Sequence, residues 1–433
     1  MPHLNGAVVF KLENMENGNK SMWRSFWSLT IIQSMNSLNE KGVQFLLIAL
    51  GIWLHAKLQY PLSVLIVLPF VLFSPLGGWL ADRFCKTRLL QCMVLLQVIV
   101  LAGMTMGLFM ENLTIAISFF SVFCIQAMFF SPAKKGLVKD IVGSENIGFA
   151  SGILEITSML ALLVGQIGAL SLVYVLLSRW GNDYGYSAAA WPCAFATCGA
   201  VLVLLLSLTI PRYKPQSSQP FRKSLLWEHF VQLRMLWRNP VLRNSEVGVG
   251  YFWFIAGMMM LIVLQMAEEN SVIAGEGINM VLAQQIDSAL LIAWISGGSI
   301  LGGVLASVIC SKKIRLWVAH VGGIGMTLGC LILAFAPYNS VLFIAALALT
   351  GFVAAGYLVP LNALLQDKAD NDKRGDVIAA GNLVDCFLGM MAVAVQYAMQ
   401  AIGLSTQLQC GLLALSSALV AIFIYRSTRH CEV

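Results

Sequence analysis

Charged residues are scarce in this chain. Of its 433 residues only 11% are Asp, Glu, Lys or Arg, whereas 58% are hydrophobic. A soluble domain usually carries about 25% charged residues. This deficit, together with repeated apolar runs of about 20 residues, excludes a soluble globular protein and predicts an all-α polytopic membrane protein. The runs are continuous rather than alternating, which excludes a β-barrel.

Metal-binding, enzymatic and targeting motifs are also missing. The ten cysteines form no CxxC pair and show no His/Cys spacing for a metal, so we interpret them as small packing residues. No His is followed by Asp at the fifth position, as an acyltransferase signature requires, and no nucleophile constellation appears, so an enzyme is not expected. The cations of this chain, whose net charge is +6, lie in loops, which does not suggest nucleic-acid binding. Residues 1–23 lack a signal-peptide pattern and are expected to form a disordered cytoplasmic tail.

We expect about twelve membrane spans in two bundles of about six. The N-terminal bundle occupies residues 24–210 and the C-terminal bundle 244–425. A cytoplasmic amphipathic linker covers 211–243, and a short cytoplasmic tail covers 426–433. The predicted spans are 24–54, 61–81, 89–110, 113–133, 147–177, 188–210, 244–267, 281–310, 315–336, 340–365, 377–402 and 408–425.

Lys and Arg lie almost entirely on one side of these spans, and the opposite side receives only Lys57 and Arg179. Cytoplasmic loops carry such an excess, so both termini are predicted to be cytoplasmic. In the linker, apolar residues from Leu225 to Trp237 alternate with basic ones. This pattern predicts a tether that lies on the anionic inner leaflet, with a lipid-sensing role as the alternative.

An LGGxLA sequence ends two of the spans, at residues 76–81 and 301–306, and each copy precedes a basic loop. Its small residues let another helix come close. At the first copy we predict a conformational latch made of Gly78, Asp82, Arg83 and Arg88, and an ordinary basic loop is the alternative. At the second copy Ser307 replaces the acid, which predicts a weaker latch.

A second, weaker sequence repeat relates spans 4 and 5 to spans 10 and 11. Pro132 precedes the first loop and Glu155 follows it, while Pro360 precedes the second loop and Asp385 follows it. Each half therefore places an acid near the cytoplasmic end of its fifth span. Parallel repeats of this kind are typical of two-lobed rocking transporters.

The stretch from Gly77 to Arg88 resembles the signature loop between spans 2 and 3 of the major facilitator superfamily, and the resemblance covers about residues 24–425. Three further stretches are similar to the bacterial lysophospholipid transporter family. They are Phe130–Gly136, Ser151–Glu155, and Val359–Gln366 with the later Ala380-Gly381-Asn382.

The resemblance implies a V-shaped secondary transporter of the bacterial inner membrane that moves lysophospholipids inward, where a separate cytoplasmic acyltransferase re-acylates them. It also implies functional roles for Glu40 in span 1, Lys134 after span 4, Glu155 in span 5 and Asn382 in span 11. In the superfamily, the carboxylate at the position of Asp82 ties its loop to the other lobe.

Two departures from the family pattern leave the substrate open. Where the family has an arginine in span 7, this chain reads Gly257-Met258-Met259-Met260. We interpret these methionines as lipid-facing or core residues rather than as contacts to an acyl chain. Span 11 carries Asp385, where the family pattern differs.

Glu40 lies near the middle of span 1, where an acid is costly unless it faces a cavity or a partner. Asn36, Glu40 and Gln44 share one helix face. We predict that Asn36 and Glu40 bind substrate or an ion, with a structural network as the alternative. For Glu155 and Asp385, transport coupling and structural pairing both stay open. No cofactor is expected, and coupling to H⁺ or Na⁺ is left open.

The sequence thus favours an inward transporter of lysophospholipids that works among membrane lipids. Its alternatives are a transporter of another amphiphile or of a small solute such as a siderophore, or a receptor that binds without transport. Headgroup preference and oligomeric state are not predicted.

Overall fold

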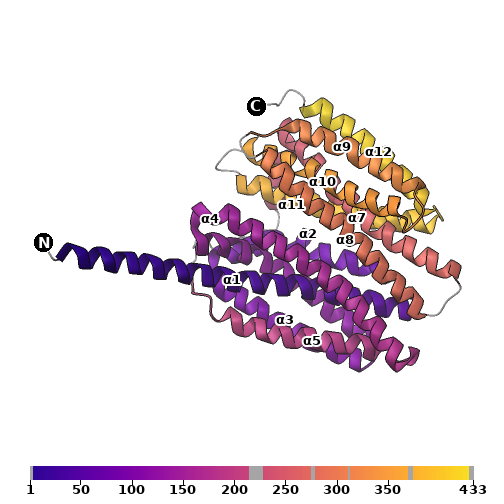
Figure 1. Ribbon diagram of the computed structural model, residues 1–433, viewed down its shortest axis with the longest axis horizontal. Coiled ribbons are helices and arrows are strands. Elements are labelled where there is room, and N and C mark those ends of the chain that lie inside the picture. Colours follow the sequence, from indigo (N-terminus) through magenta and orange to yellow (C-terminus); the bar gives the residue numbers. More distant parts are fainter. Residues whose placement is uncertain (1–2, 214–227, 275–277, 311–312, 369–373, 429–433) are drawn as a thin grey trace. The chain divides into compact units, whose positions relative to one another are not determined.

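The computed structural model describes residues 3–213, 228–274, 278–310, 313–368 and 374–428, and all regular structure in these ranges is helical (Figure 1). Bounds of the first half are α1 His3–Trp53, α2 Gln59–Arg83, α3 Lys86–Phe109, α4 Leu113–Trp180, the 3₁₀ turn η1 Asn182–Tyr184, and α5 Gly185–Ser207. Bounds of the remainder are α6 Glu228–Arg238, α7 Pro240–Ala274, α8 Ile278–Ile309, α9 Leu316–Phe335, α10 Val341–Lys368, α11 Arg374–Ala401 and α12 Thr406–Thr428.

Ten helical segments in the described residues are long and apolar enough to cross a membrane, and the two arms of α2, bent by 64° at the Phe73–Pro75 break, would make an eleventh. The chain is therefore a multi-pass membrane protein. The first expected span, the later part of α1, is not among the ten. Its polar stretch from Asn36 to Gln44 lowers its hydropathy.

Two expectations about connections were wrong. The tail expected to be disordered is helical from His3 onward, because α1 continues back through it. The loop expected between spans 4 and 5 is also absent. Instead α4 continues through a break at Gly143, whose φ of 71° and ψ of 177° leave the helical region. A positive φ favours glycine, so Gly143 suits the break.

The chain divides into two compact units. Unit 1 contains residues 1–46, 76–166 and 189–220, and unit 2 contains residues 47–75, 167–188 and 221–433. The division into bundles 24–210 and 244–425 stays a prediction.

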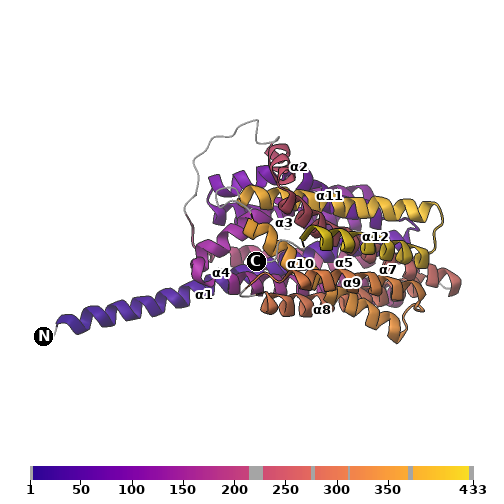
Figure 2. The ribbon, with the colours of Figure 1, turned by 90° about the horizontal axis from the view of Figure 1, so that it is seen from above.

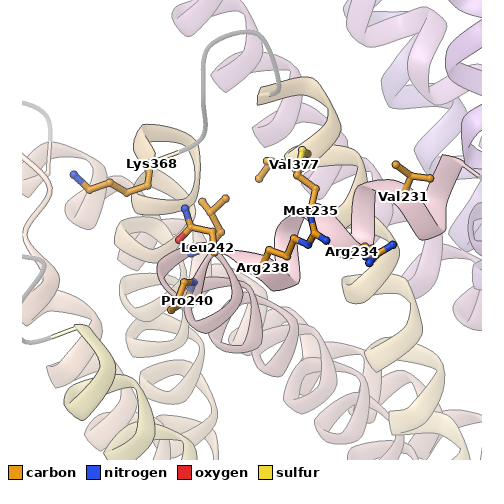
Figure 3. Close-up of a pocket in the computed structure, with 9 residues that line it drawn as sticks. Val231, Arg234, Met235, Arg238, Pro240, Leu242, Lys368 and Val377 are labelled. Atoms are coloured by element: carbon orange, nitrogen blue, oxygen red, sulfur yellow. Dashed lines mark hydrogen bonds between the residues drawn. The ribbon is translucent and has the colours of Figure 1, made fainter.

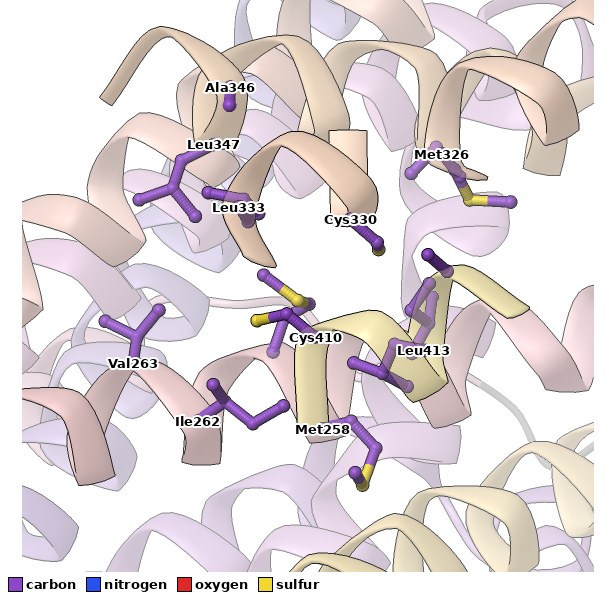
Figure 4. Packing of buried hydrophobic residues seen from close by; sticks show 14 of the residues in the cluster. Met258, Ile262, Val263, Met326, Cys330, Leu333, Ala346, Leu347, Cys410 and Leu413 are labelled. Atoms are coloured by element: carbon purple, nitrogen blue, oxygen red, sulfur yellow. The ribbon is translucent and has the colours of Figure 1, made fainter. Parts of the chain in front are cut away.

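Each unit has its own apolar core. In unit 1 the core gathers buried residues such as Phe26, Phe130 and Val203 from α1, α4 and α5. In unit 2, α10 contacts both α8 and α9, α12 lies against α9, and α11 lies against α7 (Figure 1, Figure 2). Met258, Cys330 and Leu413 lie in its core (Figure 4). Met258 and Met259 are both buried there, as the core interpretation of these methionines expected.

The LGGxLA repeat corresponds to a repeated helix contact. A Cβ atom on Gly77 of α2 would lie 3.1 Å from Met128 Sδ of α4, and one on Gly302 of α8 would clash with the Phe352 carbonyl oxygen of α10. In both copies the first glycine lets the second span of a half meet the fourth. The second glycine does not, since a Cβ on Gly78 would have nothing within 4 Å.

Candidate functional site

The polar face of α1 lies opposite a tight helix contact. A Cβ atom on Gly165 of α4 would clash with the Leu38 carbonyl oxygen, and one on Gly42 would face Gly165 at 3.7 Å. An α-helix turns about 100° per residue, so Asn36 and Glu40 lie on the side of α1 away from this contact. The backbone contact therefore fixes which way the polar face points.

Glu40 has charged neighbours from two elements. Lys41 and Lys134 both act on its carboxylate, and Cys124 of α4 lies close to it as well. Glu40 and Lys134 are half-buried, and the Lys41 ammonium donates to Gln44 Oε1 at 2.8 Å. The structure thus brings Glu40, predicted from span 1, within electrostatic reach of Lys134, predicted from span 4.

Several buried amides of unit 1 lack hydrogen-bond partners among the described residues. Asn36 Oδ1 and both polar atoms of Asn39 and Gln126 have none. Gln97 on α3 and Gln166 on α4 also carry such atoms. A buried polar atom without a partner costs about 1–3 kcal/mol, so an arrangement like this suits a region that water or a polar ligand enters.

The loop after α2 is anchored by a buried ion pair. Lys86 Nζ lies 2.8 Å from Asp140 Oδ2, and the Lys86 side chain is only 2% exposed. Next to it, the Thr87 hydroxyl donates to the Pro211 carbonyl oxygen at 2.7 Å. Burial raises the pKa of the nearby Tyr213 phenol, and the Asp140 carboxylate raises it further. This phenol therefore stays neutral at physiological pH.

The predicted latch residues have different surroundings. The Arg83 guanidinium lies over the Trp79 ring, 5.7 Å from its centroid, whereas Arg88 is exposed. The side chains of Asp82 and Glu155 lie outside the described part of the structure. At the second repeat, the Ser307 hydroxyl donates to the Gly303 carbonyl oxygen of its own helix at 2.7 Å.

In unit 2, Asp385 of α11 meets an acid that sequence reasoning missed. The Glu246 carboxyl of α7 is 0% exposed and lies within hydrogen-bonding reach of Asp385. Asn382, on the same helix as Asp385, is exposed. Glu246 follows the expected start of span 7 by two residues, so it resembled an interfacial acid. A mirrored spacing, Glu246-x₃-Gly250 against Gly381-x₃-Asp385, was the available signal.

At the other end of α7, polar groups are joined in a network. Gln409 Nε2 donates to Gln265 Oε1 at 3.1 Å, and Gln265 Nε2 donates to Glu269 Oε1 at 2.7 Å. Gln396 also donates to Gln265, and Thr406 donates to Glu269. Gln265 therefore joins α7 to α11 and α12 through side-chain hydrogen bonds.

The linker helix α6 borders an open pocket of about 730 Å³ in unit 2 (Figure 3). Arg234, Arg238 and Lys368 line it together with apolar side chains, and Figure 3 shows the two arginines on the same helix. Leu236 of α6 is fully buried and packs against Leu242 and Val377. The pocket thus combines three cations with apolar walls. The same combination is typical of a helix that lies at a membrane surface.

Unit 2 also joins α2 to α11. The Tyr60 hydroxyl donates to Gln400 Oε1 at 2.6 Å, and its ring meets that of Tyr397 edge-on at 5.2 Å. Tyr60 and Gln400 lie at the ends of α2 and α11 that are away from the cation-rich loops. This contact links the two halves of the sequence.

Membrane-crossing helices, a packing repeat and polar groups buried within the spans define a polytopic transport protein. The sequence profile of the Major Facilitator Superfamily matches residues 29–394. The chain belongs to this superfamily, which is one of transporters rather than a class of enzymes.

Relatives and solved structures agree with this assignment. The chain is 25% identical over 401 residues to the lysophospholipid transporter LplT of Enterobacter sp. (strain 638), covering 89% of this chain and 93% of the relative. It is 26% identical to LplT of Salmonella newport (strain SL254), covering 87% and 90%. Its fold is similar to a bacterial homologue of the human lysosomal transporter Spinster in an inward-facing, occupied conformation, with a TM-score of 0.65, 16% identity, and coverage of 93% and 96%. It is also similar to the nucleoside transporter NupG, with a TM-score of 0.65, 12% identity, and coverage of 93% and 99%.

Proposed function

We propose that this secondary transporter moves lysophospholipids inward across the bacterial inner membrane. The observation that carries the proposal is that Glu40 lies within electrostatic reach of Lys134, beside buried amides without partners among the described residues. A lysophosphatidylethanolamine headgroup carries a cationic amine and an anionic phosphate. Glu40 would hold the amine and Lys134 the phosphate, while Asn36 and Gln126 would donate to or accept from the glycerol oxygens.

The names of the curated relatives support this substrate class. In the proposal, both termini lie in the cytoplasm, where a separate acyltransferase re-acylates the imported lipid. Alternating access would move the headgroup site from one leaflet to the other, while the acyl chain stays among apolar side chains and lipid.

A second candidate is a transporter of another amphiphile or of a small solute such as a siderophore. It is favoured by the surroundings of Gly257 and Met258, where the family has its arginine. A Cβ on Gly257 would lie 3.0 Å from Ala392 Cβ, and Met258 is fully buried in the core. This part of α7 offers no cation to a phosphate.

The test uses bacteria that lack their own lysophospholipid uptake. The chain is expressed in them, labelled lysophosphatidylethanolamine is supplied, and its conversion to diacyl lipid is followed. Glu40→Gln should lower the conversion rate about 10- to 100-fold, because a hydrogen bond to a charged group contributes about 1.5–3 kcal/mol.

Glu111→Gln is the matched control, since Glu111 is an exposed acid in the turn after α3. It should leave conversion unchanged. Well-expressed wild-type protein that gives no conversion would rule out the lysolipid proposal and favour the second candidate.

A further inference from the structure

Glu246 and Asp385 lie at a reciprocal contact between α7 and α11. A Cβ atom on Gly381 would lie 2.7 Å from Glu246 Oε2, so a side chain at this position would displace that carboxyl group. A Cβ on Gly250, one turn along α7, would lie 3.7 Å from Asp385 Oδ1. Each acid therefore faces a glycine of the other helix, and the two carboxyl groups lie within hydrogen-bonding reach of each other.

Three of the four carboxyl oxygens of the pair lack a hydrogen-bond donor among the described residues. Both carboxyl oxygens of Glu246 and the Oδ1 atom of Asp385 are buried, and no N–H or O–H of the described residues donates to them. The Trp253 indole N–H also acts on the Asp385 carboxyl group. Glu246 is thus a fully buried acid on which the carboxyl group of Asp385 acts.

Among the described residues, no cation acts on either carboxyl group of the pair. Lys86 lies in an ion pair with Asp140, and Lys368 in one with Asp367. From α10 the Tyr357 hydroxyl is buried near Gly248.

The remaining neighbours of α7 are also accounted for. From α12 the Ser416 hydroxyl pairs with Tyr251 at 2.8 Å. On α6, Arg234 and Arg238 line the open pocket. On α8, the side chain of its acid Asp287 lies outside the described residues.

Two carboxylates within hydrogen-bonding reach of each other repel strongly where water is excluded. A hydrogen bond between two carboxyl groups needs one proton, which makes one of them a donor. With that proton the contact stabilises the α7–α11 packing, and without it the contact drives the helices apart.

We propose that Glu246 and Asp385 together hold a single proton, and that its release loosens the α7–α11 contact during the transport cycle. The second part rests on the proposed function, because it couples proton movement to lysolipid transport. The first part is a property of the protein alone. It goes beyond the sequence prediction, which named Asp385 without its partner.

Infrared spectroscopy of the purified protein tests the proton site without any substrate. The wild type should show a protonated-carboxyl carbonyl band at neutral pH that disappears as the pH is raised. Glu246→Gln and Asp385→Asn should each abolish the band, because the new amide donates to the remaining carboxylate and makes the proton unnecessary. Glu269→Gln, which changes a carboxyl on α7 that already accepts from Gln265 and Thr406, should leave it unchanged.

A second readout is thermal unfolding against pH. The folded pair binds a proton that the unfolded chain releases at neutral pH, so stability should fall as the pH rises through the titration of the pair. The Glu246→Gln variant should lose this dependence. A wild type without the band, or a band that persists in both single variants, would overturn the proton site. Because neither measurement uses lysolipid, a failed conversion assay would leave this result standing.

Discussion

At the residue scale, Lys86 anchors the charged loop to α4. Removing one member of a buried ion pair costs about 3–5 kcal/mol, because the other charge stays buried. Lys86→Met should therefore lower the thermal unfolding temperature of the detergent-solubilised protein markedly.

The double variant Lys86→Met with Asp140→Leu should recover most of that loss, since it leaves no uncompensated charge. Arg88→Met, which changes an exposed cation two residues away, should have little effect. Equal losses from Lys86→Met and Arg88→Met would show that the buried pair does not stabilise this loop.

Residue patterns predicted part of the candidate site. Glu40 was predictable because a charge in the middle of an apolar run is costly unless it faces a cavity or a partner. Lys134 was predicted from the family resemblance. Glu246 was not predictable, because an acid near the end of a span is ordinary until its burial is known. Likewise, the sequence marks both Gly77 and Gly78 as small, but only the packing shows that Gly77 is the one in contact.

At the scale of elements, the Gly165–Leu38 contact sets the orientation of α1. A methyl group at Gly165 would clash with the Leu38 carbonyl oxygen, so α1 and α4 would have to move apart. Gly165→Ala should destabilise the protein by about 1–3 kcal/mol and reduce transport.

Gly168→Ala is the matched control on the same helix, because a Cβ there would have nothing within 4 Å. It should be neutral or slightly stabilising, since alanine favours a helix. Thermal unfolding measures both variants, and indistinguishable melting temperatures would contradict the close packing of α1 on α4.

The ends of most helices were predicted to within a few residues because the bilayer thickness fixes the length of an apolar run. Where hydropathy carries no information, the prediction was wrong. The polar start of α1 and the segment around Gly143 were taken as a tail and a loop, although polar residues can continue a helix. The break at Gly143 depends on one backbone conformation, which composition does not reveal.

At the scale of the whole molecule, the Tyr60–Gln400 hydrogen bond joins residues 340 positions apart. In a rocking transporter, such a contact must break when the halves separate on that side of the membrane. Tyr60→Phe removes the hydrogen bond but keeps the ring, and should shift the conformational equilibrium by about 0.5–1.5 kcal/mol.

Hydrogen–deuterium exchange should show faster exchange at the start of α2 and the end of α11 in the Tyr60→Phe variant. Tyr184→Phe, an exposed tyrosine in η1, is the control and should not change it. Unchanged exchange in Tyr60→Phe would mean that this contact does not hold the two helix ends together.

The internal repeat was predictable because both copies keep the same small residues in the sequence. In the structure the first glycine of each copy contacts another helix: Gly77 contacts α4 and Gly302 contacts α10. Pairs such as Tyr60 with Gln400 or Glu246 with Asp385 were not predictable. They join helices that are distant in sequence, and no periodicity within either helix specifies its partner.

The central claim is that lysophospholipid is the cargo and that Glu40 binds its headgroup. The most direct test reconstitutes the purified protein in vesicles and follows the movement of a labelled lysophosphatidylethanolamine between leaflets, comparing wild type with Glu40→Gln and Glu111→Gln. We predict rapid movement with the wild type and Glu111→Gln, and a loss of about 10-fold or more with Glu40→Gln. Movement at the rate of protein-free vesicles, or equal rates in all three proteins, would contradict the account.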